Sequence, residues 1–306
     1  MNGGLKLGTR GSPLALAQAR KVAAALETAQ RWPADYVQIV PIRTKGDEIQ
    51  DRPLAEIGGK ALWTKELDRA LLAGEVDFCV HSMKDVESER PDRIHIAAMR
   101  PRGDVRERLI GAASIAALPH GARIGTSSPR RAAQLRSLRP DLNIVPLRGN
   151  IETRLAKVKS GEVDATLLTS AGLKRLGLTN VGLAVPIEVM LPAPGQAALG
   201  MECRTDDNMT QSMLTTVNDQ ITFSAVMAER AFTLALGGSC HSPVAALAIL
   251  DDGELGMRAQ LFSEDGSEMI QDKARFECGD CKTPARLALR MLDNAPAAIR
   301  SLFAPK

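Results

Sequence analysis

The chain repeats one order of apolar and polar positions. A strand-like segment at residues 5–10 leads into Gly11-Ser12-Pro13, and an Ala- and Leu-rich run follows at 14–26. Serine caps the first turn of a helix and proline fits its first position, so this pattern predicts a strand, a tight turn and a helix. The same arrangement returns at residues 124–129, with serine and proline again adjacent.

A second motif also occurs twice, in the same order. Gly74-Glu75-Val76-Asp77 precedes an apolar run at 78–80, and Gly161-Glu162-Val163-Asp164 precedes another at 165–168. Either repeat alone could be chance use of favourable caps. Together they indicate a duplicated strand–helix–strand unit, and hence two α/β lobes of common plan.

The two copies differ in length, because the first carries an extra polar, glycine-rich stretch at residues 44–60. A long loop inside a compact domain commonly covers a site, so we predict a mobile lid there. Segments with prolines at 100–104 and 191–196 predict two crossovers between the lobes. Further on, a helix at 222–236, two hairpin turns and a closing helix at 283–292 predict a third, α+β unit.

Composition places the chain among ordinary globular proteins. It is 44% hydrophobic and 25% charged, and it has no apolar run long enough to cross a bilayer. The first residues lack the apolar core of a signal peptide, and five cysteines cannot all pair within one chain. We therefore expect a reduced, cytoplasmic protein without membrane contact.

Positive charge is concentrated in one segment. Between Arg123 and Arg175, eight arginines and three lysines stand against four acidic residues, a net of +7 in a chain whose total is +3. Arginine matches carboxylate or phosphate with two parallel hydrogen bonds. The segment has no Phe, Tyr or Trp on which bases could stack, so we expect a small polyanion as ligand and no nucleic acid. Any one of these arginines could equally be part of a solvated helix face.

Two places combine charge with favourable backbone. Both Ser-Pro turns present backbone N–H groups at a helix N-terminus, with Arg10 before one and Arg130 and Arg131 after the other. They could clamp a ligand that bears several carboxylates. Asp85, beside Lys84 at the end of an apolar strand, could pair with a cationic or N–H-bearing reaction centre, or be an ordinary surface neighbour of the lysine.

Cysteine is a third candidate. Cys240 lies in a glycine-bearing loop, where His241 could favour its thiolate. A cysteine hydrolase is conceivable on these grounds, although the sequence identifies no partnered base. The lone Cys278-Gly279-Asp280-Cys281 has no second ligand pair, so we expect no metal and regard the spacing as incidental.

Six motifs, taken in order, make the chain similar to the porphobilinogen deaminases, also called hydroxymethylbilane synthases. The similarity runs from about Leu5 to Pro243, with a weaker tail beyond. The motifs are Gly8-Thr9-Arg10-Gly11-Ser12-Pro13-Leu14-Ala15, His81-Ser82-Met83-Lys84-Asp85, Gly125-Thr126-Ser127-Ser128-Pro129-Arg130-Arg131, Leu147-Arg148-Gly149-Asn150, Ala171-Gly172-Leu173-Lys174-Arg175 and Gly238-Ser239-Cys240.

The resemblance implies an α/β fold of two periplasmic-binding-protein-like lobes with mixed sheets, plus a small C-terminal α+β domain. The first lobe would comprise residues 1–99 and 196–217, and the Arg-rich second lobe 103–192. The C-terminal domain, 220–306, would carry the cofactor cysteine. The implied protein is a monomeric transferase of tetrapyrrole biosynthesis, on the route to haem, chlorophyll or corrin.

The implied reaction joins four porphobilinogen molecules, with loss of ammonia, to a dipyrromethane cofactor held by Cys240 through a thioether. Hydroxymethylbilane is then released by hydrolysis. Asp85 would accept pyrrole N–H groups and stabilise the cationic azafulvene that forms as ammonia leaves. The cofactor would be bound by Ser82, Lys84, Asp85, Thr126, Ser127, Ser128, Arg130 and Arg131. Substrate would be bound by Arg10, Ser12, Gln18, Arg148, Arg154 and Arg175.

Some positions depart from the family pattern. Ala61, Trp63 and Ala197 stand where Gly, Phe and Gly are common, which bears on lid flexibility and local packing but not on the chemistry. Two alternatives stay open. A non-catalytic two-lobed protein that binds a carboxylate ligand would give Cys240 no task, and a nucleic-acid-binding module is disfavoured by the missing aromatic residues.

Overall fold

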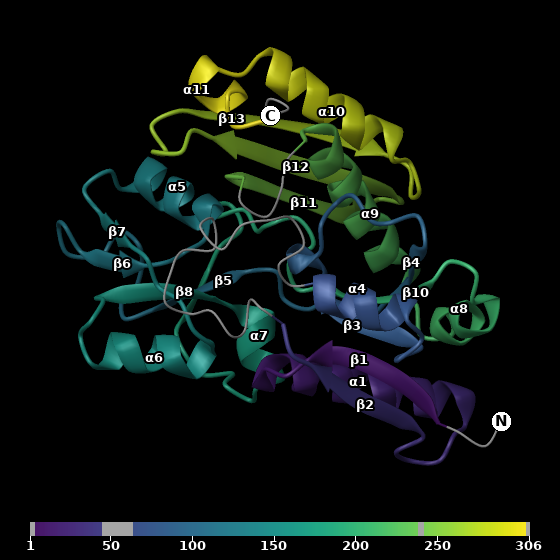
Figure 1. Cartoon of the computed structure of the whole chain (residues 1–306). Coiled ribbons are helices and arrows are strands. Elements are labelled where there is room, and N and C mark those ends of the chain that lie inside the picture. Colours follow the sequence, from purple (N-terminus) through teal and green to yellow (C-terminus); the bar gives the residue numbers. More distant parts are fainter. Residues whose placement is uncertain (1–3, 45–63, 238–241, 304–306) are drawn as a thin grey trace.

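The computed structural model describes residues 4–44, 64–237 and 242–303, which form three sheets with their helices (Figure 1). Within these ranges, the first sheet has the strand order β2-β1-β3-β10-β4. β1, β2 and β3 are parallel, and β10 runs antiparallel between β3 and β4. The bounds are β1 Leu5–Arg10, β2 Val37–Ile42, β3 Phe78–Ser82, β4 Ile94–Met99 and β10 Leu199–Arg204.

The second sheet has the same plan, in the order β7-β6-β8-β5-β9. Again three strands are parallel, and the fourth, β5, runs antiparallel to both of its neighbours. This shared order confirms the common plan predicted from the repeated motifs. The bounds are β5 Glu107–Ile110, β6 Arg123–Gly125, β7 Asn143–Val145, β8 Ala165–Thr169 and β9 Leu183–Val185. We refer to each sheet with its helices as the first and the second lobe.

The predicted helix starts are also confirmed. α1 begins at Pro13, where the Ser12 hydroxyl accepts a hydrogen bond from the third helical N–H at 3.3 Å. α5 begins at Pro129, where Ser128 accepts from the N–H of Arg131 at 3.4 Å. The helices of the two lobes are α1 Pro13–Gln30, α4 Lys65–Leu72, α5 Pro129–Leu138, α6 Ile151–Lys159, α7 Ser170–Arg175 and α8 Asn208–Thr215.

The aspartate of the second repeated motif has the same contact in each lobe. Asp77 accepts a hydrogen bond from the backbone N–H of Lys6 at 2.7 Å, and Asp164 accepts one from Arg123 at 2.7 Å. The glycine that opens each motif has φ of 72° or 74°, a left-handed conformation that costs glycine little. The motif is therefore a turn that leads from a helix into β3 or β8 and fixes the start of the neighbouring strand.

The C-terminal unit is an antiparallel meander, β11-β12-β13, covered by helices. Figure 1 shows it, in green to yellow, above the two lobes. One face of the sheet packs against Phe232 and Leu287, which are buried on helices. Its elements are α9 Gln220–Ala235, β11 Val244–Asp251, β12 Glu254–Phe262, β13 Met269–Phe276, α10 Lys282–Asp293 and α11 Ala297–Arg300. The predicted helices and hairpins of this unit are thus present.

Two connections join the lobes where the prolines predicted them. β4 ends in the first sheet at Met99 and β5 begins in the second at Glu107, and the chain returns between β9 and β10. Apart from Thr44, the predicted lid lies outside the described residues, as do Ala61 and Trp63. In the three described ranges, no helix has the length and apolarity that crossing a membrane requires.

Candidate active site

A cleft of about 640 Å³ lies between the lobes, at the carboxyl ends of their parallel strands. This is where open α/β sheets place their ligand sites. In the described part of the chain, two carboxylates line it, those of Asp85 and Glu152, and basic side chains outnumber them. The basic residues are Arg10, Arg43, Lys84, Arg130, Arg131, Arg148, Arg154 and Arg175.

Helix N-termini add to this positive field. The N-cap residues of α1, α5, α6 and α7 all line the cleft. Unpaired backbone N–H groups and the helix dipole favour anions at such ends. These N-cap residues are Ser12, Ser128, Asn150 and Thr169.

The lobes differ where the third parallel strand ends. The registers of the two sheets make Ser82 the counterpart of Thr169. In the second lobe, Thr169 caps a regular helix, α7. In the first lobe, the residues after Ser82 form only one 3-10 turn, Met83–Asp85, and the backbone is extended again at Val86. The shortened turn leaves Lys84 and Asp85 lining the cleft.

These two side chains have different electrostatic surroundings. Burial lowers the pKa of Lys84 to about 8, because the attraction of Asp85 offsets it only in part and Arg131 adds repulsion. The ammonium is therefore charged at neutral pH but close to its titration. Among the described residues, no group donates a hydrogen bond to the Asp85 carboxylate, which faces the cleft without a fixed partner.

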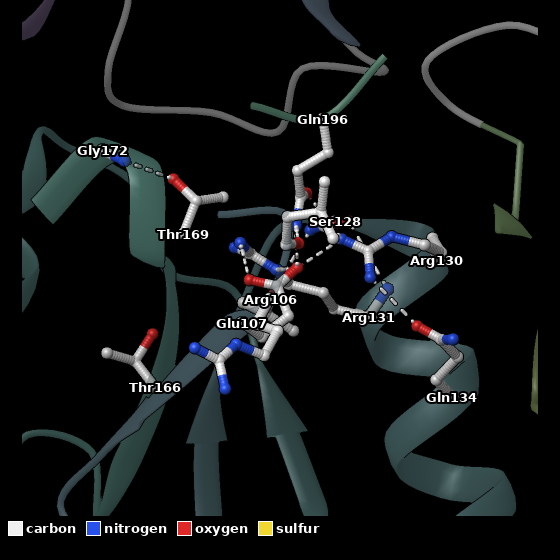
Figure 2. A network of polar contacts seen from close by, with 12 residues as sticks. Arg106, Glu107, Ser128, Arg130, Arg131, Gln134, Thr166, Thr169, Gly172 and Gln196 are labelled. Atoms are coloured by element: carbon white, nitrogen blue, oxygen red, sulfur yellow. Dashed lines mark hydrogen bonds and ion pairs between the residues drawn. The ribbon is translucent and has the colours of Figure 1, made fainter. Parts of the chain in front are cut away.

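Behind the cleft, one buried carboxylate holds the two adjacent arginines of α5 (Figure 2). Glu107, at the start of β5, is fully buried and lies 2.7 Å from both Arg130 and Arg131. Burial alone would raise the pKa of Glu107, but the two guanidinium groups hold it well below its usual range. The carboxylate is thus ionised and orients both arginines.

Arg130 is the more fully engaged of the pair. Besides Glu107, it donates hydrogen bonds to the side chain of Gln134 at 3.0 Å and to the backbone oxygen of Leu191 at 3.2 Å. Gln196 donates to Glu107 at 3.3 Å from the return crossover. Both arginines line the cleft and pair with Glu107, but Arg130 has further bonds that fix its position, whereas Arg131 has Glu107 as its ion-pair partner.

Two further arginines are positioned by backbone oxygens. Arg154 donates to Gly149 at 3.0 Å, and Arg175 donates to Ala197 at 2.6 Å. Burial lowers the pKa of each to about 10, so both are charged at neutral pH. Ala197 has φ of 71°, which explains why glycine suits this position: alanine pays a steric cost there that glycine avoids.

Strand β3 is supported from both sides. Gln18 of α1 donates to the Ser82 hydroxyl at 3.0 Å. On the other side, fully buried Glu202 lies 3.2 Å from His81 and 2.8 Å from Arg90. Burial raises the pKa of Glu202, but His81 and Arg90 lower it to about 2. This buried network fixes the strand that leads into Lys84 and Asp85.

The structure brings most of the predicted site residues to this cleft. Thr126 is an exception, because it is buried and its hydroxyl accepts a hydrogen bond from the N–H of Ser128 at 3.1 Å. Cys240 lies outside the described residues. Residues that do line the cleft are Arg10, Ser12, Gln18, Ser82, Lys84, Asp85, Ser127, Ser128, Arg130, Arg131, Arg148, Arg154 and Arg175.

Sequence reasoning missed several residues of this region, among them Asn150, Arg43 and Glu107. Asn150 could have been found, because an asparagine just before a helical stretch is a typical N-cap. Arg43 follows an apolar strand and could have been found from the internal repeat. Glu107 gave no local signal, since its partners lie more than twenty positions further along the chain.

Comparison with known proteins agrees with the site. Residues 5–212 match the family model described as "Porphobilinogen deaminase, dipyromethane cofactor binding domain", and residues 223–294 match "Porphobilinogen deaminase, C-terminal domain". The chain is 52% identical over 306 residues to a porphobilinogen deaminase of Sphingopyxis alaskensis, covering 98% of this chain and 96% of that one. It belongs to the porphobilinogen deaminase family.

A second curated relative and one solved structure are also similar to the chain. A porphobilinogen deaminase of Paracoccus denitrificans is 48% identical over 269 residues, which cover 87% of this chain and 86% of that one. Among solved structures, a TRAP periplasmic solute binding protein from Desulfovibrio salexigens is similar at 12% identity and a TM-score of 0.42, over 76% of each chain.

Family membership makes the chain a transferase of tetrapyrrole biosynthesis with a dipyrromethane cofactor. The cleft suits that cofactor. A dipyrromethane carries acetate and propionate groups, and the basic side chains and helix N-termini supply matching donors from both lobes.

Proposed function

We propose that this member of the porphobilinogen deaminase family assembles its product in the cleft between the lobes, on a dipyrromethane attached through a thioether to Cys240. When bound, the dipyrromethane supplies the primer to which four porphobilinogen units are added in turn, each with loss of ammonia. The observation that carries the proposal is a cleft that, in the described part of the chain, is lined by eight basic residues, with the Asp85 carboxylate facing it. Hydrolysis then releases hydroxymethylbilane.

The basic side chains would neutralise the negative charge of the ligand's carboxylates. Each pyrrole unit brings two carboxylates, so the demand for positive charge grows with every addition. Lys84, Ser82, Ser127, Ser128 and Arg131 would hold the cofactor, with Arg130 and Thr126 positioning that group from behind. Substrate carboxylates would be held by Arg10, Ser12, Gln18, Arg148, Arg154 and Arg175.

Asp85 would act on the reacting ring itself. Positive charge develops on the pyrrole nitrogen as ammonia departs, and a carboxylate facing that N–H stabilises it. Asp85 lies in the turn that follows β3, and most of the charged residues around it in the cleft are basic. Its negative charge therefore has a local effect at the reacting ring, whereas the arginines act on the carboxylates at the periphery.

Attachment at Cys240 is supported by the residues that follow it. β11 begins at Val244, and the N–H of Ala246 donates to Pro192 at 3.1 Å. The next residue, Ala193, lines the cleft. The first described residues after position 241 therefore lie close to the cleft wall, which supports a tether at Cys240.

Intact-mass spectrometry tests the proposal directly. We expect the purified wild type to carry an added mass the size of a dipyrromethane, and Cys240→Ser to lack it. The exposed Cys278→Ser is the matched control and should keep the added mass. A folded wild type of unmodified mass would refute the proposal and favour a non-catalytic binding protein.

We also infer that the protein works as a monomer in a reducing cytoplasm. Four cysteines in the described ranges are free, including the closely spaced Cys278 and Cys281, which supports a reducing setting. One chain supplies both walls of the cleft, so no second copy is needed to complete it.

A further inference from the structure

The internal repeat identifies a counterpart of Arg148 in the first lobe. In the first sheet, Gly8 of β1 pairs with Val40 of β2. In the second sheet, Gly125 of β6 pairs with Val145 of β7. Arg148 lies three residues beyond Val145, and the residue three positions beyond Val40 is an arginine, Arg43.

The equivalence holds elsewhere in the two sheets. Gly8 also pairs with Cys79, and Gly125 with Thr166. The motif aspartates, Asp77 and Asp164, each precede these partners by two residues, and they make the same backbone contact. The alignment of Arg43 with Arg148 therefore follows from the strand register of the whole repeat.

Arg43 is also available for a ligand. It lines the same cleft as Arg148 and is exposed. Among the described residues, its guanidinium takes part in no hydrogen bond or ion pair, in contrast to Arg130, which is held by Glu107. A guanidinium without such contacts, facing a cleft for a polycarboxylate, can donate hydrogen bonds to a carboxylate of the ligand.

Strand order places Arg43 away from the reacting centre. Asp85 follows β3, Arg10 ends β1 and Arg43 follows β2, in the sheet order β2-β1-β3. Neighbouring strands are about 4.8 Å apart, so the end of β2 is roughly 10 Å from the end of β3. Arg148 occupies the same outer position in the second lobe, after the edge strand β7.

We propose that Arg43 binds a carboxylate of a pyrrole ring distal to the reacting centre, from the first lobe, as Arg148 does from the second. This inference rests on the proposed function, because it needs a growing chain of pyrroles in the cleft. Its effect should increase with chain length. The first addition can proceed with the inner residues alone, whereas later additions place more carboxylates in the outer part of the cleft.

The test uses the holoenzyme and limiting porphobilinogen. Arg43→Gln removes the charge and keeps a polar side chain, and Arg93→Gln changes an exposed arginine of the same lobe that does not line the cleft. Samples are quenched over time and the masses of protein-bound chains are measured. We expect Arg43→Gln to keep the dipyrromethane and to make the first addition within about 2-fold of the wild type, while later additions slow about 3- to 10-fold.

A second readout is independent of turnover. An attached chain should raise the melting temperature, because its carboxylates contact the basic residues of the cleft only in the folded state. At equal chain length, that increase should be smaller in Arg43→Gln than in Arg93→Gln. Arg43→Lys should recover part of both effects, since lysine keeps the charge but not the bidentate geometry.

The outcomes separate this inference from the proposed function. A wild type without a dipyrromethane-sized mass would refute both. A loaded wild type with Arg43→Gln equal to Arg93→Gln in both readouts would refute the role of Arg43 alone. Equal slowing of the first and the later additions would refute the distal assignment.

Discussion

Lys84 and Asp85 are adjacent residues of one turn, yet each is suited to a different task. Burial, with a smaller contribution from Arg131, lowers the pKa of the Lys84 ammonium. Asp85 has no fixed partner among the described residues and faces the cleft. A ligand carboxylate can therefore pair with the ammonium while a ring N–H donates to the carboxylate.

Replacing Asp85 tests the role of the carboxylate. Asp85→Asn keeps the size of the side chain and removes its charge, so stabilisation of the cationic ring is lost. We expect turnover to fall about 10²- to 10³-fold while the dipyrromethane stays attached. Product formation and intact mass measure the two effects. Asp92→Asn, an exposed aspartate of the same lobe, should change neither, and near-normal turnover of Asp85→Asn would show that its charge is not needed.

The lowered pKa of Lys84 predicts a pH dependence of porphobilinogen binding, because the cofactor that Lys84 would hold is part of the site to which porphobilinogen binds. The ammonium is charged below pH 8 and loses its charge as the pH rises through about 8, so it attracts carboxylates less at higher pH. We expect the KM for porphobilinogen to rise up to about tenfold between pH 7 and pH 9. The measurement is a pH profile of KM.

Lys84→Arg provides the control for this profile, because a guanidinium stays charged over the same range. The rise in KM should be much smaller in this variant. If Lys84→Arg shows the same rise as the wild type, another group must be responsible for it.

At the scale of elements, local chemistry made much of the fold predictable. Ser12 and Ser128 predict the starts of their helices, because an N-cap bonds only to residues close by in the sequence. The repeated aspartate motif likewise predicts where β3 and β8 begin. The common plan of the lobes followed from those signals. Most of the candidate site could be named for the same reason, since its residues lie in short motifs at strand and helix ends.

The remaining features depend on contacts between distant parts of the chain. β10 enters the first sheet between β3 and β4 only after the chain has passed through the second lobe, and no pattern within residues 199–204 specifies that register. Glu107 likewise acquires its role from α5. The first lobe has a 3-10 turn at Asp85 where the second has the regular helix α7, and this difference also lacks a local signal.

At the scale of the whole molecule, one carboxylate joins all three units. Fully buried Glu229, on α9, pairs with Arg102 of the first crossover at 2.7 Å. The same carboxylate accepts hydrogen bonds from the N–H of Gly195 in the return crossover, at 2.6 Å, and from that of Ala248 in β11, at 2.8 Å. The relative placement of the cleft walls and the C-terminal unit thus depends on this junction.

We expect Glu229→Gln and Arg102→Gln each to lower the free energy of unfolding by about 3–5 kcal/mol, because each leaves a buried charge without its partner. The double variant removes both charges and should cost clearly less than the two single changes together. Urea unfolding of the wild type, the singles and the double measures this coupling. Arg275→Gln breaks an exposed pair with Asp251 and should change stability little.

The coupling distinguishes a junction from two separate contributions. If Glu229 served only to accept the backbone N–H groups of Gly195 and Ala248, which bond to different oxygens, then Glu229→Gln would lose one of the two hydrogen bonds. Its cost would then be the same whatever residue stood at 102. Additive single effects would support that simpler role. A large coupling would show instead that ion pairing at the crossover holds the two lobes and the C-terminal unit in the arrangement that forms the cleft.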